Sequence, residues 1–268
     1  MRLLYLGDVV GRSGRRAVGE HLPHLRKEKD LHFVVVNAEN ATNGRGLTMA
    51  HAGELFRAGA NCLTLGDHAF DQREMVRGVE TDRRILRPLN YGKTVPGHGA
   101  ATFETPAGHR VYVAQVLGRV FMRPNFDDPF SAIDTALKPV PLGVRADAII
   151  VDVHAEATSE KNALGWYLDG RVSLVVGSHT HIPTADGRIL PGGTAYLTDA
   201  GMCGAYDGVI GFDREVPIGQ FRTGMKTSAA TPAKGPATVS GILVETDDAT
   251  GLAKSLEPVR IGGALASC

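Results

Sequence analysis

Cysteine is scarce in this sequence. Only three cysteines occur among 268 residues, and no two of them form a C-x-x-C pair. A disulfide framework needs an even set of cysteines and a thiolate zinc site needs closely spaced pairs, so we expect neither. A reducing compartment fits this composition best, and we expect the protein to be cytoplasmic.

Long apolar runs and an excess of charge of one sign are also missing. No stretch reaches the roughly 18 apolar residues of a membrane span, and Asp8 interrupts the first apolar segment too early for a signal peptide. The 29 basic residues balance the 29 acidic ones. Nucleic-acid and membrane-surface proteins usually carry a basic excess, so the balance speaks against both partners, although it is compatible with a local basic cleft.

The residues that are present predict a folded α/β protein. Hydrophobic residues make up 43% of the chain, enough for a sizeable core. Short apolar runs typical of buried strands alternate with amphipathic stretches typical of helices. The predicted strands are 3–6, 33–36, 62–65, 148–153 and 174–176, and the predicted helices are 13–29, which contains Pro23, 48–59, 71–80 and 159–168.

Two antiparallel hairpins complete the predicted elements. One is expected around residues 106–109, between 101–105 and 110–114, and the other joins 237–244 to 253–261. No linker or charge run divides the sequence. We therefore expect one domain over residues 1–268.

Polar residues that can bind metals follow all five predicted strands. They are Asp8, then Glu39 and Asn40, then Asp67 and His68, then His154, and finally His179 and His181. In open α/β sheets, ligands bind beyond the carboxyl ends of the strands. A lone Asp after a strand is usually a cap or turn residue. A whole cluster of carboxylates and imidazoles, however, would suffer desolvation and repulsion without a cation. We therefore predict a metal site at this sheet edge.

The predicted site has more ligands than one ion needs, so we expect two ions. Carboxylates and imidazoles suit Zn, Mn, Fe, Co or Ni. Two ions about 3.5–4 Å apart can share a hydroxide and hold the oxygens of a phosphoryl group during an in-line displacement. This arrangement predicts a metal-dependent hydrolase.

Other familiar catalytic motifs are absent, and two alternative functions are compatible with the sequence. The sequence contains no Walker A, G-x-G-x-x-G, H-E-x-x-H or G-x-S-x-G motif. An amidohydrolase-type enzyme also uses H-x-H, but normally after its first strand, whereas here the motif is His179-Thr180-His181. The second alternative is a non-catalytic regulator that binds RNA or protein and keeps a vestigial metal site.

The order of the motifs resembles that of the calcineurin-like metallophosphoesterases, and most of all their YmdB-like branch. The matching segments are Gly7 to Arg12, Asn37 to Asn40, Thr64 to Asp71, His154 to Lys161, Gly177 to Asp186 and Thr198 to Met202. The resemblance implies a four-layer α/β/β/α sandwich. It also implies a dinuclear phosphodiesterase that uses a metal-bridging hydroxide.

The resemblance further implies small-molecule phosphodiester substrates and a cofactor of two metal ions. The expected substrates are 2′,3′-cyclic nucleotides, with 3′,5′-cyclic nucleotides second. Fe and Mn are the preferred ions, with Zn or other divalent ions as alternatives. RNA is a further candidate partner, and no membrane partner is expected. We also expect the protein to form a homo-oligomer.

The resemblance assigns a role to each site residue. Asp8, Glu39, Asn40 and His181 would hold the first ion, and Glu39 would bridge to a second ion held also by Asp67, His154 and His179. His68 is the expected catalytic residue, which would protonate or stabilise the leaving oxygen. Arg12 would contact the substrate phosphate, although an exposed arginine at a helix start is the commoner interpretation.

Two residues depart from the family pattern. Val10 stands where the wider superfamily has a histidine ligand, a feature that members of the YmdB-like branch share. Asp67 stands where the family usually has asparagine. Asp8, Glu39 and Asp67 together with a hydroxide would cancel the charge of two divalent ions. We therefore expect the site to prefer a trivalent–divalent pair or to bind phosphate less tightly than its relatives do.

Overall fold

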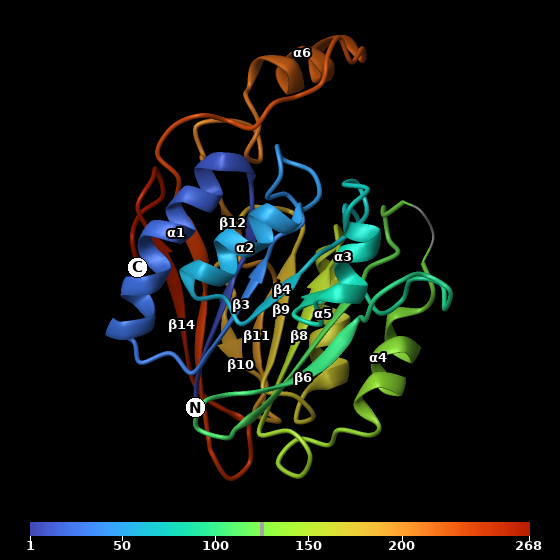
Figure 1. Ribbon diagram of the computed structural model, residues 1–268, viewed down its shortest axis with the longest axis vertical. Coiled ribbons are helices and arrows are strands. Elements are labelled where there is room, and N and C mark those ends of the chain that lie inside the picture. Colours follow the sequence, from blue (N-terminus) through green and yellow to red (C-terminus); the bar gives the residue numbers. More distant parts are fainter. Residues whose placement is uncertain (124–125) are drawn as a thin grey trace.

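The computed structural model describes residues 1–123 and 126–268, and its centre is a pair of stacked six-stranded sheets (Figure 1). The first sheet contains, in order across it, β14 (Ala253–Ile261), β13 (Val239–Thr246), β1 (Arg2–Leu6), β3 (Phe33–Asn37), β4 (Cys62–Thr64) and β5 (Ile85–Leu86). The second contains β10 (Arg188–Ile189), β11 (Ala195–Leu197), β9 (Leu174–Ser178), β8 (Ala148–His154), β7 (Arg110–Leu117) and β6 (Ala100–Glu104). A short parallel pair joins β2 (Asp8–Val9) to β12 (Met202–Cys203).

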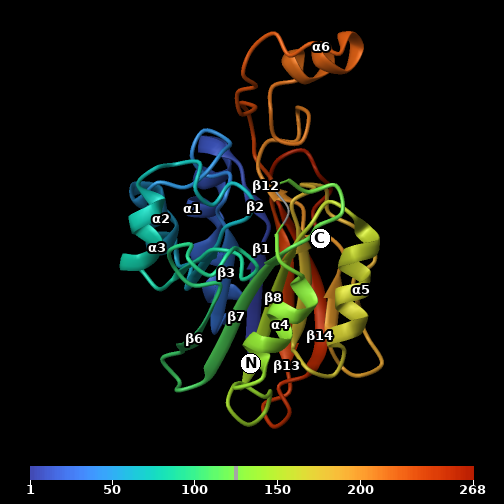
Figure 2. The ribbon, with the colours of Figure 1, turned by 90° about the vertical axis from the view of Figure 1, so that its right-hand side faces the viewer.

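Helices cover the outer faces of both sheets (Figure 2). The first sheet is covered by α1 (Gly11–Glu28), α2 (Met49–Ala58) and α3 (Met75–Thr81), and the second by α4 (Pro129–Leu137) and α5 (Thr158–Leu168). This is the expected four-layer α/β/β/α sandwich, which is thereby confirmed. No helix in the described ranges has the length and apolar character that a bilayer crossing requires.

Both faces of the central strands are buried, which explains why their sequences are continuous apolar runs. In β1, Leu4 and Leu6 pack with α1 and α2, whereas Leu3 and Tyr5 pack between the sheets. Strands β1, β3, β4 and β5 are parallel, as are β7, β8, β9 and β11. The carboxyl ends of the parallel strands therefore meet at one edge of the molecule.

Both predicted hairpins are confirmed, as β6 with β7 and β13 with β14. The helix predicted to begin at residue 71 begins at Met75 instead, because residues 71–74 form turns that bring Asp71 beside His68. Helix α1 continues through Pro23 and is held by its buried Val18, Leu22 and Leu25. Helix α4 was not predicted.

A long excursion, residues 204–238, separates β12 from β13, and we call it the arm. Its helix α6 (Glu215–Thr223) has no buried residue and stands away from the sandwich (Figure 2). The two limbs of the arm pair through bridges between Gly204 and Thr238 and between Phe212 and Pro232. The arm rises from the same edge of the molecule as the strand ends.

Candidate metal centre

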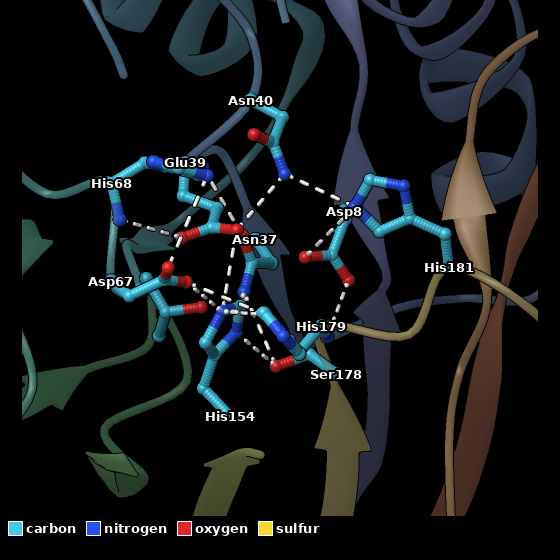
Figure 3. A network of polar contacts seen from close by, with 12 residues as sticks. Asp8, Asn37, Glu39, Asn40, Asp67, His68, His154, Ser178, His179 and His181 are labelled. Carbon is cyan, nitrogen blue, oxygen red and sulfur yellow. Dashed lines mark hydrogen bonds and ion pairs between the residues drawn. The ribbon is translucent and has the colours of Figure 1, made fainter. Parts of the chain in front are cut away.

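The strand ends bring all the predicted ligands together (Figure 3). Asp8 follows β1, Glu39 and Asn40 follow β3, Asp67 follows β4, His154 ends β8, and His179 and His181 follow β9. Glu39, Asp67, His154 and His179 form one group that could hold an ion, and Asp8, Glu39 and His181 form a second. Since Glu39 belongs to both groups, it lies where a bridging ligand would be needed.

The first group is centred on His154. Its Nε2 lies 3.1 Å from Asp67 Oδ1, 3.2 Å from Glu39 Oε1 and 3.1 Å from His179 Nδ1. His154 and Glu39 are fully buried, while Asp67 and His179 are partly exposed. Ligand atoms of two carboxylates and two imidazoles thus converge on one point.

The second group contains a buried carboxylate oxygen without a partner. Asp8 Oδ1 has no hydrogen-bond partner among the described residues and lies 3.8 Å from His181 Nε2. Such an orphaned oxygen is costly unless a cation or donor satisfies it, so the residues fit a metal ion. Asn40 Nδ2 donates to Glu39 Oε1 at 2.9 Å and lies 3.1 Å from His181 Nε2. Coordination by Asn40 requires its amide to turn so that Oδ1 faces the ion.

A layer of buried polar residues fixes the orientation of His154. Ser178 Oγ donates to Asp152 Oδ1 at 2.6 Å and lies 2.8 Å from His154 Nδ1. Because the hydroxyl hydrogen of Ser178 goes to Asp152, Ser178 accepts from His154 Nδ1. This arrangement keeps the Nε2 lone pair of His154 free for a metal.

The two histidines of the H-x-H motif are held by different partners. His181 Nδ1 lies 2.8 Å from the carbonyl oxygen of Ile210 in the arm, and His179 Nε2 lies 3.4 Å from Glu156 Oε2. Both histidines have positive φ, 93° for His179 and 67° for His181. The turn between β9 and Ile182 therefore needs support from its surroundings.

A buried ion pair supplies that support. Lys161 Nζ on α5 donates to Asp199 Oδ2 at 2.6 Å, and the Thr180 hydroxyl donates to the same oxygen at 2.7 Å. Lys161 and Asp199 fall in segments that match the family pattern, but their pairing was not predicted. No local pattern in the sequence marks this pair, because 38 residues separate the two.

The electrostatics of the ligands show that the cluster attracts positive charge. Burial, offset in part by His154 and reinforced by Glu39, raises the pKa of Asp8 to about 7. Burial opposes protonation of His154, yet Glu39 and Asp67 outweigh it and raise the His154 pKa well above its ordinary value. Burial likewise acts against ionised Asp67, but hydrogen bonds from His154 and His179 lower its pKa. Without a cation, protons supply the positive charge that these carboxylates need.

His68 lies beside the ligand groups and belongs to neither. Its Nδ1 lies 3.0 Å from Asp71 Oδ2, and its Nε2 lies 4.0 Å from Asp67 Oδ2. Its backbone N–H donates to Glu39 Oε2 at 3.1 Å. The imidazole is therefore tethered at Nδ1 while Nε2 faces the carboxylate cluster.

The ligands open into a hollow of about 300 Å³. Its lining is Glu39, Asn40, Arg45, His68, Glu156, His179, Thr180, His181, Ile210 and Phe212. Sequence reasoning missed Arg45, Ile210 and Phe212. Arg45 stands between Gly44 and Gly46 in the loop that follows Glu39 and Asn40, and this position is the one feature of the sequence that could have indicated it. Arg12 does not line this hollow, but a neighbouring one with Asn43 and Lys234.

Comparisons with known proteins agree over nearly the whole chain. Residues 4–259 match the model of the family described as YmdB-like protein. A 2′,3′-cyclic-nucleotide 2′-phosphodiesterase of Bacillus subtilis (strain 168) is 44% identical over 261 residues, which cover 97% of each chain. All of the strand ends that carry the metal-binding side chains lie within these matched regions.

Two solved structures share the fold. A hypothetical protein of Thermus thermophilus has a TM-score of 0.91 and 40% identity, with 98% of this chain and 100% of that chain covered. A Mycoplasma pneumoniae protein described as a novel phosphatase has a TM-score of 0.90 and 35% identity, with coverage of 98% and 93%. The sandwich and the arrangement of its strand ends therefore have close structural counterparts.

Proposed function

The chain belongs to the YmdB-like protein family, and from this premise we propose that it is a metal-dependent phosphodiesterase acting on 2′,3′-cyclic nucleotides. The observation that carries the proposal is the pair of ligand groups that share Glu39, with the orphaned Asp8 Oδ1 beside them. The name of the Bacillus relative supports the substrate class. A second candidate substrate is a 3′,5′-cyclic nucleotide.

We propose that two ions occupy the centre. Asp8, Glu39, Asn40 and His181 would hold one, and Glu39, Asp67, His154 and His179 the other. When bound, such ions polarise phosphoryl oxygens and lower the pKa of water toward about 7. Fe and Mn suit this mixture of carboxylates and imidazoles, and Zn and other divalent ions belong in the same test.

The residues around the ions position the substrate and move a proton. Hydrolysis at the 2′ position adds the hydroxyl of water to phosphorus and breaks the P–O2′ bond. His68 Nε2 donates a proton to the departing O2′, so the product carries a 3′-phosphate and a free 2′-hydroxyl. Asp71 holds His68 through Nδ1 and is a positioning residue. Arg45 at the edge of the hollow supplies positive charge for the phosphate, and Arg12 remains a prediction as a phosphate contact.

The test is hydrolysis of 2′,3′-cyclic AMP, 3′,5′-cyclic AMP and bis-p-nitrophenyl phosphate by protein loaded with Mn or Fe. We expect turnover that stops on metal removal. His68→Ala should lower kcat by about 100-fold or more with its metal content retained. His24→Ala, a change of an exposed histidine on α1, is the matched control and should have no effect.

The competing function is the non-catalytic regulator with a vestigial site. The relatives whose names state an activity are phosphodiesterases or phosphatases, so this alternative is not favoured. Metal-loaded protein that turns over none of the substrates with any divalent ion would nevertheless favour it. RNA-binding and pull-down measurements would then define its role.

We also propose a cytoplasmic location and a homo-oligomeric assembly. The scarcity of cysteine supports a cytoplasmic location. Exposed apolar side chains such as Phe121, 85% exposed, and Trp166, 55% exposed, support a homo-oligomer that covers them. Light scattering during size-exclusion chromatography measures the number of subunits.

A further inference from the structure

A groove leads away from the metal centre beneath the arm. The hollow at the metals shares Arg45, Ile210 and Phe212 with a second hollow of about 450 Å³. The second hollow shares Asn43 and Ala230 with a third of about 680 Å³. The three hollows therefore adjoin one another in sequence from the metal ligands to the start of α1, and we call the surface that they form the arm groove.

The charge of the arm groove differs from that of the whole chain. The linings of the second and third hollows contain five basic side chains and no acidic one, and the metal hollow shares one of the five, Arg45. They are Arg12, Arg16, Arg45, Lys226 and Lys234. Within residues 1–123 and 126–268, none of the five forms an ion pair. A row of unneutralised cations in a protein without net charge is complementary to a polyanion.

Apolar surfaces lie between these cations. Phe212 lines both the metal hollow and the second hollow, and Phe221 on α6 lines the second hollow and is 84% exposed. Val216 and Pro217 complete this apolar wall. Aromatic and apolar faces interleaved with basic residues are the surface on which single-stranded nucleic acids bind, because bases stack while phosphates meet the cations.

The position of the arm groove decides which nucleic acid fits. It opens directly into the centre proposed to hydrolyse 2′,3′-cyclic phosphates, and such a group forms only on a ribose with a 2′-oxygen. The metal hollow alone lies at the lower end of the roughly 300–1,000 Å³ found for small-ligand pockets. A mononucleotide therefore leaves the basic part of the arm groove unused.

We infer that the substrate class includes single-stranded RNA with a 2′,3′-cyclic phosphate at its 3′ end, and that the arm groove binds the nucleotides upstream of that end. The inference rests on the proposed function and deepens it. Water supplies the hydroxyl that joins phosphorus and the proton that reaches O2′, so the product is RNA with a 3′-phosphate. Phe212 and Phe221 stack on bases, and Arg16, Lys226 and Lys234 contact phosphates.

The first measurement compares a hexaribonucleotide that ends in a 2′,3′-cyclic phosphate with the matching cyclic mononucleotide. At low salt we expect kcat/KM for the hexamer to exceed that for the mononucleotide by about tenfold or more, because each stacked base and each phosphate contact adds affinity. This advantage should shrink as salt is raised. Equal efficiency for both substrates overturns the inference and leaves the proposed function standing.

The second measurement uses the double variant Arg16→Ala/Lys234→Ala, whose side chains line the third hollow and not the metal hollow. We expect the ratio of hexamer to mononucleotide kcat/KM to fall about tenfold. The matched control is Lys138→Ala/Arg145→Ala, which removes the same charge beside α4, and it should keep the wild-type ratio. An identical ratio in both double variants overturns the inference.

A binding measurement separates the inference from the proposed function. If neither substrate is turned over, the proposed function fails. Fluorescence anisotropy with a labelled hexamer that ends in a 3′-phosphate then tests the arm groove directly. Binding that weakens in Arg16→Ala/Lys234→Ala but not in the control supports the arm groove, and absence of binding overturns it. A last outcome concerns Phe221→Ser. If this variant forms a smaller assembly than the wild type does, and the wild type does not prefer the hexamer, the surface binds a second copy of the chain and the inference is overturned.

Discussion

Asp67 places a third carboxylate at the metal centre, beside Asp8 and Glu39. We expect Asp67→Asn to lower KM for a cyclic nucleotide by roughly tenfold, because one negative charge less faces the anionic substrate. The metal content should shift toward two divalent ions. Kinetics combined with metal analysis check both expectations, and an unchanged KM with unchanged metals would remove the charge argument.

The ion pair of Lys161 and Asp199 determines the geometry of the H-x-H turn. Lys161 is 1% exposed and Asp199 is fully buried, so Lys161→Met would leave a buried carboxylate without its cation. We expect a loss of about 3–5 kcal/mol in the free energy of unfolding and a Tm lower by roughly 10 °C.

The double variant Lys161→Met/Asp199→Asn is the control for this explanation. It removes both charges, so we expect it to regain part of the lost stability while metal binding at His179 and His181 stays weak. A Tm in Lys161→Met equal to that of the wild type would contradict the role of the pair. Thermal melts followed by circular dichroism provide the measurement.

The loop after β4 leaves no space for a side chain at Gly66. A Cβ there would overlap Glu39 Oε2 and His154 Nε2. We expect Gly66→Ala to reduce bound metal by more than half while the secondary structure stays intact, because only the ligands at the strand end are displaced.

Gly19→Ala is the matched control for this prediction. Gly19 lies within α1, and a Cβ there meets no atom within 4 Å. Alanine should therefore stabilise the helix by about 0.5–1 kcal/mol and leave metal binding unchanged. Equal metal content in Gly66→Ala and Gly19→Ala would refute the steric argument.

The sheets could be predicted from the sequence because burial on both faces produces short, uninterrupted apolar runs. Strands β1, β3, β4, β8 and β9 carry that signal, and each ends in, or is closely followed by, a residue that could bind a metal. The ligands could therefore be predicted together with the strands. Their closeness follows from parallel strands meeting at one edge.

The arm and the remaining site residues could not be predicted in this way. Helix α6 buries no residue, so it has no apolar stripe of the kind that marks a packed helix. Ile210 and Phe212 line the metal hollow because the arm folds back beside residues that are distant in the sequence. Such contacts depend on tertiary structure and leave no periodic pattern in the sequence.

We expect metal binding to stabilise the entire chain. The ligands come from both sheets, so a bound ion connects the two halves of the sandwich. Such an ion binds the folded state and not the unfolded chain. At a free metal concentration about 1,000 times Kd, the added stability is about 4 kcal/mol, which corresponds to a Tm increase of roughly 10 °C.

Chelation tests this link. We expect the Tm of the metal-free protein to be lower by that amount and to recover when Mn is added back. Asp8→Asn should show a smaller difference between its metal-free and metal-loaded forms, because one ligand of the centre is weakened. A Tm that is independent of metal would indicate that the ligand groups hold no ion tightly.

The hydrogen bond from His181 to the Ile210 carbonyl has a thermodynamic consequence. It joins a residue of the metal centre to the arm, and Ile210 also lines the arm groove. We therefore expect binding in the groove and binding of metal at the centre to be coupled equilibria. Such coupling is reciprocal. If RNA bound in the groove changes the affinity for metal by some factor, the metal changes the affinity for that RNA by the same factor.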